Sequence, residues 1–262
     1  MPVNAQQYNV YTPEVYKQQE VIQSPRGRAI KGNVIELLVD YSGSMGPWII
    51  LSKETLEYIL PKLPQDTYVA LRVVGGRGID YQPKFCQETK LIVNFQKNNR
   101  EDIINGLQDV YIGGNTPLTL ALKDSVVSDL AHVSTLRKNS KVVKNKKIIL
   151  VTDGYENCGA NVCEYVREVL KARKDIQIDV ILVGPNTNLM CLTAITGGRF
   201  YKIYKVKDQR KVFINAFEAV FDVPAGTVPV DKVNNLTKED GAKVDVPKSD
   251  GPSSKGYKFI NY

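Results

Sequence analysis

The chain has 262 residues, with 35 Lys and Arg against 28 Asp and Glu, which gives a formal net charge of +7. Hydrophobic residues make up 43% of the chain, and the 19 Gly and 13 Pro residues are ordinary numbers, which excludes collagen-like and wholly low-complexity proteins. The length allows one α/β domain with tails or two small domains. A basic surplus can indicate nucleic acid or an anionic membrane, so its place along the chain matters.

No secretory signal is predicted in the N-terminal segment. Residues 1–14 lack a basic segment followed by an apolar run, so we expect a cytoplasmic protein. Residues 1–30 show no helical or strand periodicity and are predicted to be extended or mobile. The longest uncharged run, 180–198, is broken by Gly184 and Pro185, which favours a strand, a loop and a helix start over a membrane span.

Residues 31–222 alternate between strand and helix patterns. The apolar run 33–39 ends at Asp40 and is typical of a strand covered on both faces. Further strands are predicted at 67–74, 90–95, 147–152, 177–183 and 199–204, and helices at 47–60, 99–109, from 117 to about 137, 161–174, 187–196 and 209–221. No helix separates strand 90–95 from the strand before it, so we expect this strand to be antiparallel and at an edge.

This order of elements predicts the fold class. We expect a doubly wound, Rossmann-like α/β domain with a mostly parallel sheet, one antiparallel edge strand and helices on both faces. Beyond this domain, residues 223–262 are rich in Pro, Gly, Asp, Lys, Ser and Asn and predict a disordered or loosely docked tail. The more aromatic end, 257–262, could dock on the domain or on a partner.

Most of the basic surplus lies in one run that contains no acidic residue. Its members are Arg137, Lys138, Lys141, Lys144, Lys146 and Lys147. A nucleic-acid surface would combine such charges with aromatic residues or a groove-entering helix, and neither is present here. We interpret the run as a solvated loop, with a surface for an acidic partner as the second interpretation.

Five oxygen-bearing residues are expected at the carboxyl edge of the sheet, where α/β folds bind ligands. Asp40, Ser42 and Ser44 follow the first strand, Thr116 precedes the long helix, and Asp153 ends a later strand. Because all five donate through oxygen, the set favours Mg²⁺, Mn²⁺ or Ca²⁺ over Zn²⁺ or Cu²⁺. Few direct carboxylates and several neutral hydroxyls leave a divalent ion under-neutralised, so the site favours a carboxylate from a partner.

The pattern Asp40-x-Ser42-x-Ser44, followed by Thr116 and Asp153, resembles the intact metal-ion-dependent adhesion site of von Willebrand factor type A domains. The resemblance covers roughly residues 30–222. Four stretches look like those of prokaryotic, stand-alone members, namely 68–73, 114–118, 151–158 and 194–201. The resemblance implies that Ser42, Ser44 and Thr116 bind the metal directly, that Asp40 binds directly or through water, and that Asp153 binds through water.

The resemblance implies cation-dependent protein binding, without catalysis, to a partner that presents Asp or Glu. The alternative is a substrate-adaptor subunit of a motor ATPase or metal-chelatase assembly. A hydrolase that uses Ser44 comes third, because the sequence around it, 43–46, misses the GxSxG spacing by one position and only His132 could act as the base. No nucleic-acid partner is expected.

The four cysteines are Cys86, Cys158, Cys163 and Cys191, at uneven spacings and without a CxxC pair, so a zinc finger is not supported. They resemble positions at which similar prokaryotic domains, often exported, carry Cys. Cys158 and Cys163 are near enough in sequence for a local disulfide, and free thiols are the open alternative. Such a disulfide would indicate an extracytoplasmic protein.

Two aromatic residues lie next to the predicted metal loops. Trp48 follows the Ser44 turn, and Tyr155 follows Asp153. Either residue could pack in the core or border a binding face, and we expect both to pack in the core.

Overall fold

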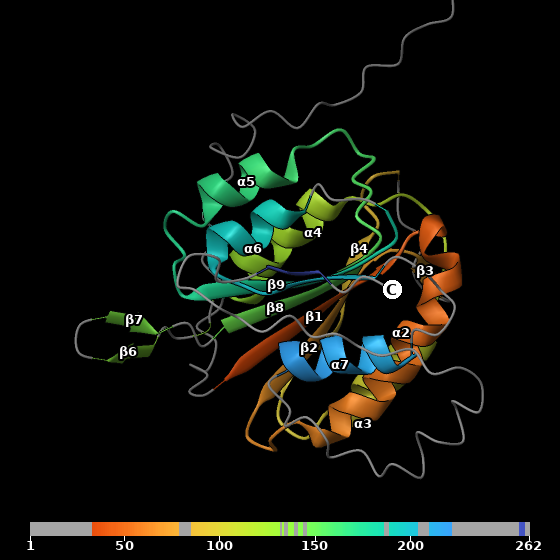
Figure 1. Cartoon of the computed structure of the whole chain (residues 1–262), viewed down its shortest axis with the longest axis horizontal. Helices are drawn as coiled ribbons and strands as arrows, with labels where there is room; N and C mark the ends of the chain where they lie inside the picture. The colour runs from red at the N-terminus through yellow and green to blue at the C-terminus, as the bar shows by residue number, and fades with distance from the viewer. Residues whose placement is uncertain are drawn as a thin grey trace, which may run out of the picture.

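The computed structural model describes residues 33–78, 85–131, 133, 136–138, 141–143, 146–185, 189–203, 210–221 and 257–259. In these ranges the main sheet has seven strands in the order β11-β10-β9-β8-β1-β2-β4 (Figure 1). Its strands are β1 (Val34–Tyr41), β2 (Tyr68–Gly75), β4 (Thr89–Gln96), β8 (Lys146–Thr152), β9 (Ile176–Val183), β10 (Phe200–Ile203) and β11 (Tyr257–Phe259). Neighbouring strands are parallel except β2 and β4, which are antiparallel, so the predicted edge strand is confirmed.

Helices cover both faces of this sheet. Figure 1 shows α4, α5 and α6 on one face and α2, α3 and α7 on the other. The helices are α2 (Gly46–Ile59), α3 (Arg100–Gln108), α4 (Leu118–Lys123), α5 (Val162–Val169), α6 (Met190–Thr196) and α7 (Arg210–Val220). Short helical turns are η1 (Gly43–Met45), η2 (Leu60–Lys62) and η3 (Asp124–Asp129). This layered arrangement confirms the predicted doubly wound α/β fold class.

The central strand β1 explains why the fold has two cores. All eight of its residues are buried. Because side chains alternate across a strand, Leu37 and Val39 pack with α2, α3 and α7, whereas Val34 and Leu38 pack with α4, α5 and α6. The near-continuous apolar pattern that predicted this strand therefore follows from its burial on both faces.

The helix predicted from 117 to about 137 is much shorter than expected. It is α-helical only over α4, becomes a π-helix in η3, and is followed by the two-stranded ladder of β6 (Leu136–Lys138) and β7 (Lys141–Val143). The Arg72 side chain bonds both Asp124 and Asp129. Residues five apart lie about 140° apart around an α-helix, and the wider π-helix brings them to one side.

The interpretation of the basic run as a solvated loop is wrong for its last two members. Lys146 is 2% exposed, and its Nζ lies 2.5 Å from Oδ2 of Asp175. The Nζ of Lys147 lies 3.4 Å from Oδ2 of Asp179 and donates to a carbonyl at the end of α7. Lys144 and the side chains of the three earlier members lie outside the described residues.

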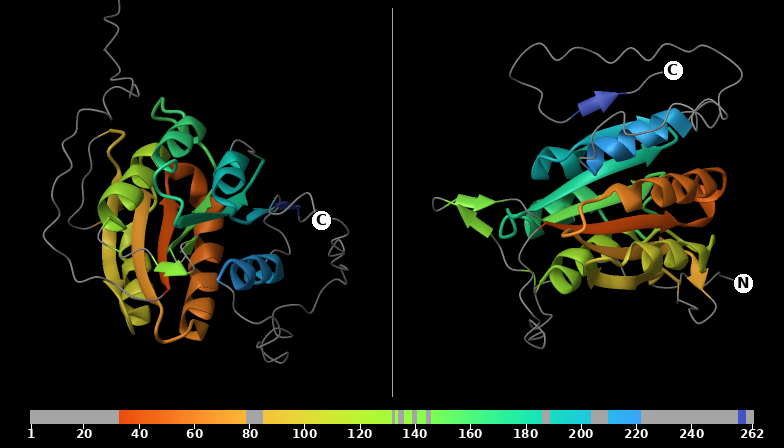
Figure 2. Two further views of the ribbon diagram at one scale, coloured as in Figure 1. Left: turned by 90° about the vertical axis from the view of Figure 1, so that its left-hand side faces the viewer. Right: turned by 90° about the horizontal axis from the view of Figure 1, so that it is seen from below.

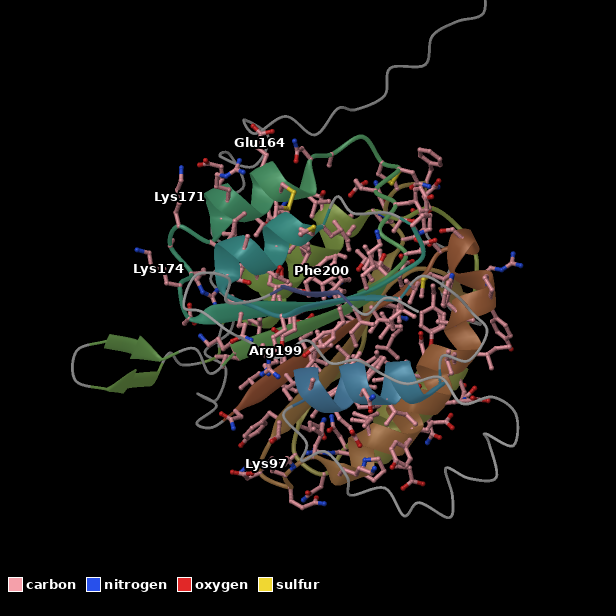
Figure 3. The ribbon with its side chains drawn as sticks, viewed as in Figure 1. Lys97, Glu164, Lys171, Lys174, Arg199 and Phe200 are labelled. Atoms are coloured by element: carbon pink, nitrogen blue, oxygen red, sulfur yellow. A yellow bond between two sulfur atoms is a disulfide. The ribbon has the colours of Figure 1, made fainter. Side chains whose placement is uncertain are left out.

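Other exposed charges are found on α5 and on the segment that follows it. Figure 3 shows Lys171 and Lys174 projecting outward there. Near α7, the same view labels Arg199, whose guanidinium donates to the carbonyl of Ala219. Positive charge in the described part of the chain is therefore divided between solvated side chains and structural ion pairs.

The predicted tails fall largely outside the described residues. This applies to segment 1–30 and to 223–256, whereas β11 pairs in parallel with β10 at the edge of the sheet (Figure 2). Each helix in the described ranges is too short or too polar to cross a bilayer.

Candidate metal centre

Four loops meet at the carboxyl ends of β1, β2 and β8. Asp40 lies at the end of β1, and Asp153 follows β8, which pairs with β1. The loop between the short strand β5 (Val110–Tyr111) and α4 lies against β1, because the N–H of Gly113 donates to the carbonyl of Tyr41 at 2.9 Å. The other short strand, β3 (Arg77–Gly78), pairs with β5 just beyond β2. The topology therefore brings the predicted ligand segments to one edge.

Asp40 is fully buried and is held by two donors. Its Oδ1 accepts the N–H of Ser42 at 2.8 Å, and its Oδ2 accepts the hydroxyl of Thr152 at 2.6 Å. Burial raises the pKa of Asp40 to about 7, and the bonds from Thr152 and Ser42 oppose this rise. A cation beside this carboxylate would offset the cost of burying its charge.

Two serines and Asp153 extend the cluster. The hydroxyl oxygens of Ser42 and Ser44 lie 3.2 Å apart. Burial raises the pKa of Asp153, and the nearby Ser44 hydroxyl opposes this rise. The charge of Asp153 in turn raises the pKa of Asp40, so the two acids lie close together. Oδ1 of Asp153 is buried and has no hydrogen-bond partner.

Thr116 is placed by residues of the loop that follows β8. Its backbone N–H donates to Oδ1 of Asn157 at 2.8 Å, and the N–H of Thr119 donates to Oε2 of Glu156, also at 2.8 Å. The hydroxyl Oγ1 of Thr116 is buried and lacks a hydrogen-bond partner. Leaving a buried hydroxyl unpaired costs about 1–3 kcal/mol, so a ligand for this oxygen is expected.

Gly75 allows the ligand loops to approach each other. Its φ is +67°, and a Cβ at this position would lie 2.7 Å from the carbonyl oxygen of Asn115 and 2.8 Å from the backbone nitrogen of Ser42. Only Gly adopts this left-handed conformation without strain and without a clash. The segment that carries Thr116 therefore lies directly beside the serine turn.

These residues fit a hard divalent cation. Two neighbouring ligands on an octahedral cation with bonds of about 2.1 Å lie about 3 Å apart, close to the separation of the Ser42 and Ser44 hydroxyls. The unpaired oxygens of Thr116 and Asp153 could complete such a set. Among the described residues, no three His, Cys, Asp or Glu side chains are grouped to hold a metal, which matches a site built largely from hydroxyls.

Sequence reasoning missed the residues that position these ligands. They are Thr152, Glu156, Asn157 and Glu88. Glu88 accepts from the side-chain amide of Asn115 at 3.3 Å through Oε1, and its Oε2 is buried without a partner. Three of the four lie in the stretch 151–158, which resembles the family, although the resemblance assigned no role to these three residues. No sequence pattern indicated a role for Glu88.

Two disulfides replace the predicted local pair. Cys86 bonds Cys158, and Cys163 bonds Cys191. The expectation of a Cys158–Cys163 pair is therefore wrong, as is that of free thiols. The first disulfide joins the β2–β4 connection to the loop that carries Asp153, and the second joins α5 to α6. Disulfides are typical of proteins that fold in an oxidising compartment.

The two neighbouring aromatics differ in their surroundings. Trp48 is 7% exposed and packs in the core between α2 and the sheet, as predicted. Tyr155 is 49% exposed, so the expectation of core packing is wrong for this residue.

The sheet topology and the oxygen-rich edge together match a known class of domain. A family model described as von Willebrand factor type A domain matches residues 35–218. The chain belongs to this family, whose members are in general metal-dependent protein-interaction modules without enzymatic activity.

Individual relatives are similar to the chain at low sequence identity. The chain is 26% identical over 193 residues to the uncharacterized protein YwmC of Bacillus subtilis (strain 168), covering 68% of this chain and 80% of YwmC. It is similar to proximal thread matrix protein 1 from the mussel byssus, solved with a zinc-occupied metal-ion-dependent adhesion site (MIDAS) motif. The TM-score is 0.50 at 18% sequence identity, and the match covers 74% of this chain and 47% of that protein. It is also similar to the SpRpn10 VWA domain (TM-score 0.52, 14% identity, 71% and 95%).

Proposed function

We propose that the chain is a divalent-cation-dependent protein-binding domain that captures an acidic side chain of a partner. Asp40, Ser42, Ser44, Thr116 and Asp153 hold the cation, which is Mg²⁺, with Mn²⁺ or Ca²⁺ as substitutes. When bound, the cation supplies a positive centre with open positions for a carboxylate. The observation that carries the proposal is the pair of buried, unpartnered oxygens on Thr116 and Asp153 beside the Asp40 carboxylate.

The protein's own residues determine what the site accepts. Asp153 would contact the cation through water and the other ligands are mostly neutral hydroxyls, so few negative charges touch the cation directly, and a partner's Asp or Glu supplies a direct one. Thr152 and Asn157 orient the ligand segments through hydrogen bonds and do not themselves meet the partner.

We infer an extracytoplasmic location because of the two disulfides. ATP-driven assemblies work in reducing compartments where disulfides are rare, which disfavours the adaptor alternative.

The substitution Thr116→Val tests the site directly. It removes the unpaired hydroxyl but keeps the shape of the side chain, so the apo protein should be as stable as the wild type or more so. Calorimetry with Mg²⁺ and Mn²⁺ should show binding to the wild type and at least about a tenfold loss in the variant. The matched control is Thr193→Val, a buried threonine on α6 that bonds the carbonyl of Met190. Equal affinity in all three proteins would overturn the proposal.

A further inference from the structure

Large apolar side chains gather at the same edge as the metal centre. In the described ranges, five large hydrophobic residues are exposed, namely Ile50 (66%), Phe85 (65%), Tyr111 (58%), Val127 (52%) and Tyr155 (49%). All but Val127 belong to segments that surround the predicted ligands. Exposed apolar groups that cluster in this way indicate an interaction surface, whereas isolated ones are ordinary.

Two of these residues contact the ligand loops through their backbone. Tyr155 follows Asp153 by two positions; burial raises the pKa of Asp153, and the nearby backbone N–H of Tyr155 opposes this rise. Tyr111 is in β5, and its carbonyl oxygen lies 3.0 Å from where a Cβ on Gly76 would be. Gly76 itself donates to the carbonyl of Gly113, in the loop that leads to the ligand Thr116.

The other two residues flank the site from different elements. Phe85 precedes Cys86, and the disulfide to Cys158 fixes it beside the loop that follows β8. Ile50 lies near the start of α2, which begins two residues after Ser44. The same helix buries its neighbours Trp48 and Ile49 in the core, whereas the side chain of Ile50 is left exposed to solvent.

We propose that Ile50, Phe85, Tyr111 and Tyr155 form an apolar rim around the metal centre. The rim fits a partner protein segment in which an Asp or Glu is flanked by apolar or aromatic side chains. This inference rests on the proposed function, because the acidic residue is the one that the metal centre takes. Apolar contacts around a charged contact exclude water and strengthen the electrostatic attraction.

The shape of this edge favours a protein over a small molecule. The cavity beside the Cys86–Cys158 disulfide, bordered by Pro117 and Glu156, has a volume of about 10 Å³, room for no more than one water molecule. Small-molecule sites usually enclose about 300–1,000 Å³. An open surface with aromatic side chains instead resembles a protein interface, in which a few aromatic residues carry most of the affinity.

Selection from a random 12-residue peptide library displayed on phage tests the proposal. The immobilised full chain is used in Mg²⁺, and bound phage are eluted with EDTA. We expect the enriched peptides to contain Asp or Glu next to Phe, Tyr, Trp, Leu or Ile. The substitutions Phe85→Ser, Tyr111→Ser and Tyr155→Ser should each weaken binding of a synthetic enriched peptide about tenfold while leaving Mn²⁺ affinity unchanged. Val127→Ser is the matched control, because it is similarly exposed but lies on η3.

The outcomes separate this inference from the proposed function. A wild type that fails to bind Mg²⁺ or Mn²⁺ contradicts the proposed function. Three outcomes would contradict the rim if the wild type binds metal. The selection could enrich no peptide, it could enrich acidic peptides without apolar neighbours, or the three rim substitutions could leave peptide binding unchanged. Sedimentation could also show a Mg²⁺-dependent dimer whose formation displaces the peptides. In that case a second copy of the chain would bind the rim, and the inference would be overturned.

Discussion

The side-chain oxygen Oδ1 of Asn157 accepts the backbone N–H of Thr116 at 2.8 Å. This bond joins the loop after β8 to the loop before α4, 41 residues apart in the chain. It leaves the Thr116 hydroxyl free for another partner. Asn157 therefore orients a predicted ligand residue without itself being a ligand.

We expect Asn157→Ala to weaken divalent-cation binding by about fivefold to tenfold, the equivalent of one lost hydrogen bond. Calorimetric titration with Mn²⁺ measures this change. The control is Asn161→Ala in the same loop. Asn161 caps α5 by accepting the N–H of Glu164 at 3.1 Å, so its loss should cost about 1 kcal/mol of stability without changing cation affinity. Equal cation affinity in wild type and Asn157→Ala would show that Thr116 is held by other contacts.

The Cys86–Cys158 disulfide should support both stability and cation binding. It closes a chain separation of 72 residues, and removing such a crosslink costs about 4 kcal/mol in the chain-entropy model. Cys158 directly follows Asn157, so the double variant Cys86→Ser/Cys158→Ser should also bind Mn²⁺ about tenfold more weakly.

The second disulfide provides the control for this prediction. Cys163–Cys191 spans 28 residues between α5 and α6, and its removal should cost about 3.5 kcal/mol but leave Mn²⁺ affinity unchanged. Denaturant unfolding gives the stabilities, and calorimetry gives the affinities. If both double variants bind Mn²⁺ equally, the first disulfide has no special role in positioning the site.

Local sequence patterns were sufficient for the fold class and for placing the predicted ligand segments at one edge of the sheet. Near-continuous apolar runs give β1, β8 and β9, because strands buried on both faces carry apolar residues at most positions. The carboxyl ends of parallel strands meet at one edge, so the sequence alone predicts that Asp40 and Asp153 lie together.

The errors arise from partners that are distant in sequence. Cys86 is 72 residues from Cys158, and Arg72 is 57 residues from Asp129, which lies in the π-helix that interrupts the predicted long helix. Lys146 is likewise buried by a partner 29 residues away. No local period carries such information, because each contact depends on how the strands are ordered in the sheet.

A buried acid on β1 should make stability depend on pH. Glu36 is completely buried, and its Oε1 accepts the hydroxyl of Ser125 at 2.9 Å and lies 3.7 Å from Nε of Arg72. Burial raises the pKa of Glu36 well above its ordinary value, and the charge of Asp129 and a hydrogen bond to it raise this pKa further, against the opposing charge of Arg72. The folded protein therefore holds this proton more tightly than the unfolded chain does.

The direction of the effect follows from proton linkage. Above pH 4.5, the ordinary pKa of a glutamate, the unfolded chain loses the proton first, so the contribution of Glu36 to the free energy of unfolding falls as pH rises. Glu36→Gln cannot lose a proton, and its stability relative to the wild type should increase by at least about 1 kcal/mol between pH 5 and pH 8. Denaturant unfolding at both pH values measures this, with the exposed Glu101→Gln on α3 as control. A pH-independent difference would contradict the prediction.

Gly75 should be essential for the packing of the ligand loops. A methyl group at this position would lie 2.7 Å from the Asn115 carbonyl oxygen and 2.8 Å from the Ser42 nitrogen, so Gly75→Ala must push the two loops apart. The left-handed backbone adds about 1–2 kcal/mol of strain. We expect a total loss of about 2–4 kcal/mol in the free energy of unfolding, with at least about a tenfold loss of Mn²⁺ affinity.

Gly184→Ala separates backbone strain from the clash. Gly184 has a φ of +84°, but a Cβ there meets no atom within 4 Å, so this variant should lose only about 1–2 kcal/mol and bind Mn²⁺ normally. Denaturant unfolding and calorimetry on the two variants provide the comparison. The Cβ added in Gly75→Ala meets atoms of Asn115 and Ser42, so the substitution pushes the Ser42 turn and the Thr116 loop apart. Unchanged Mn²⁺ affinity in this variant would therefore mean that cation binding does not depend on close contact between these two segments.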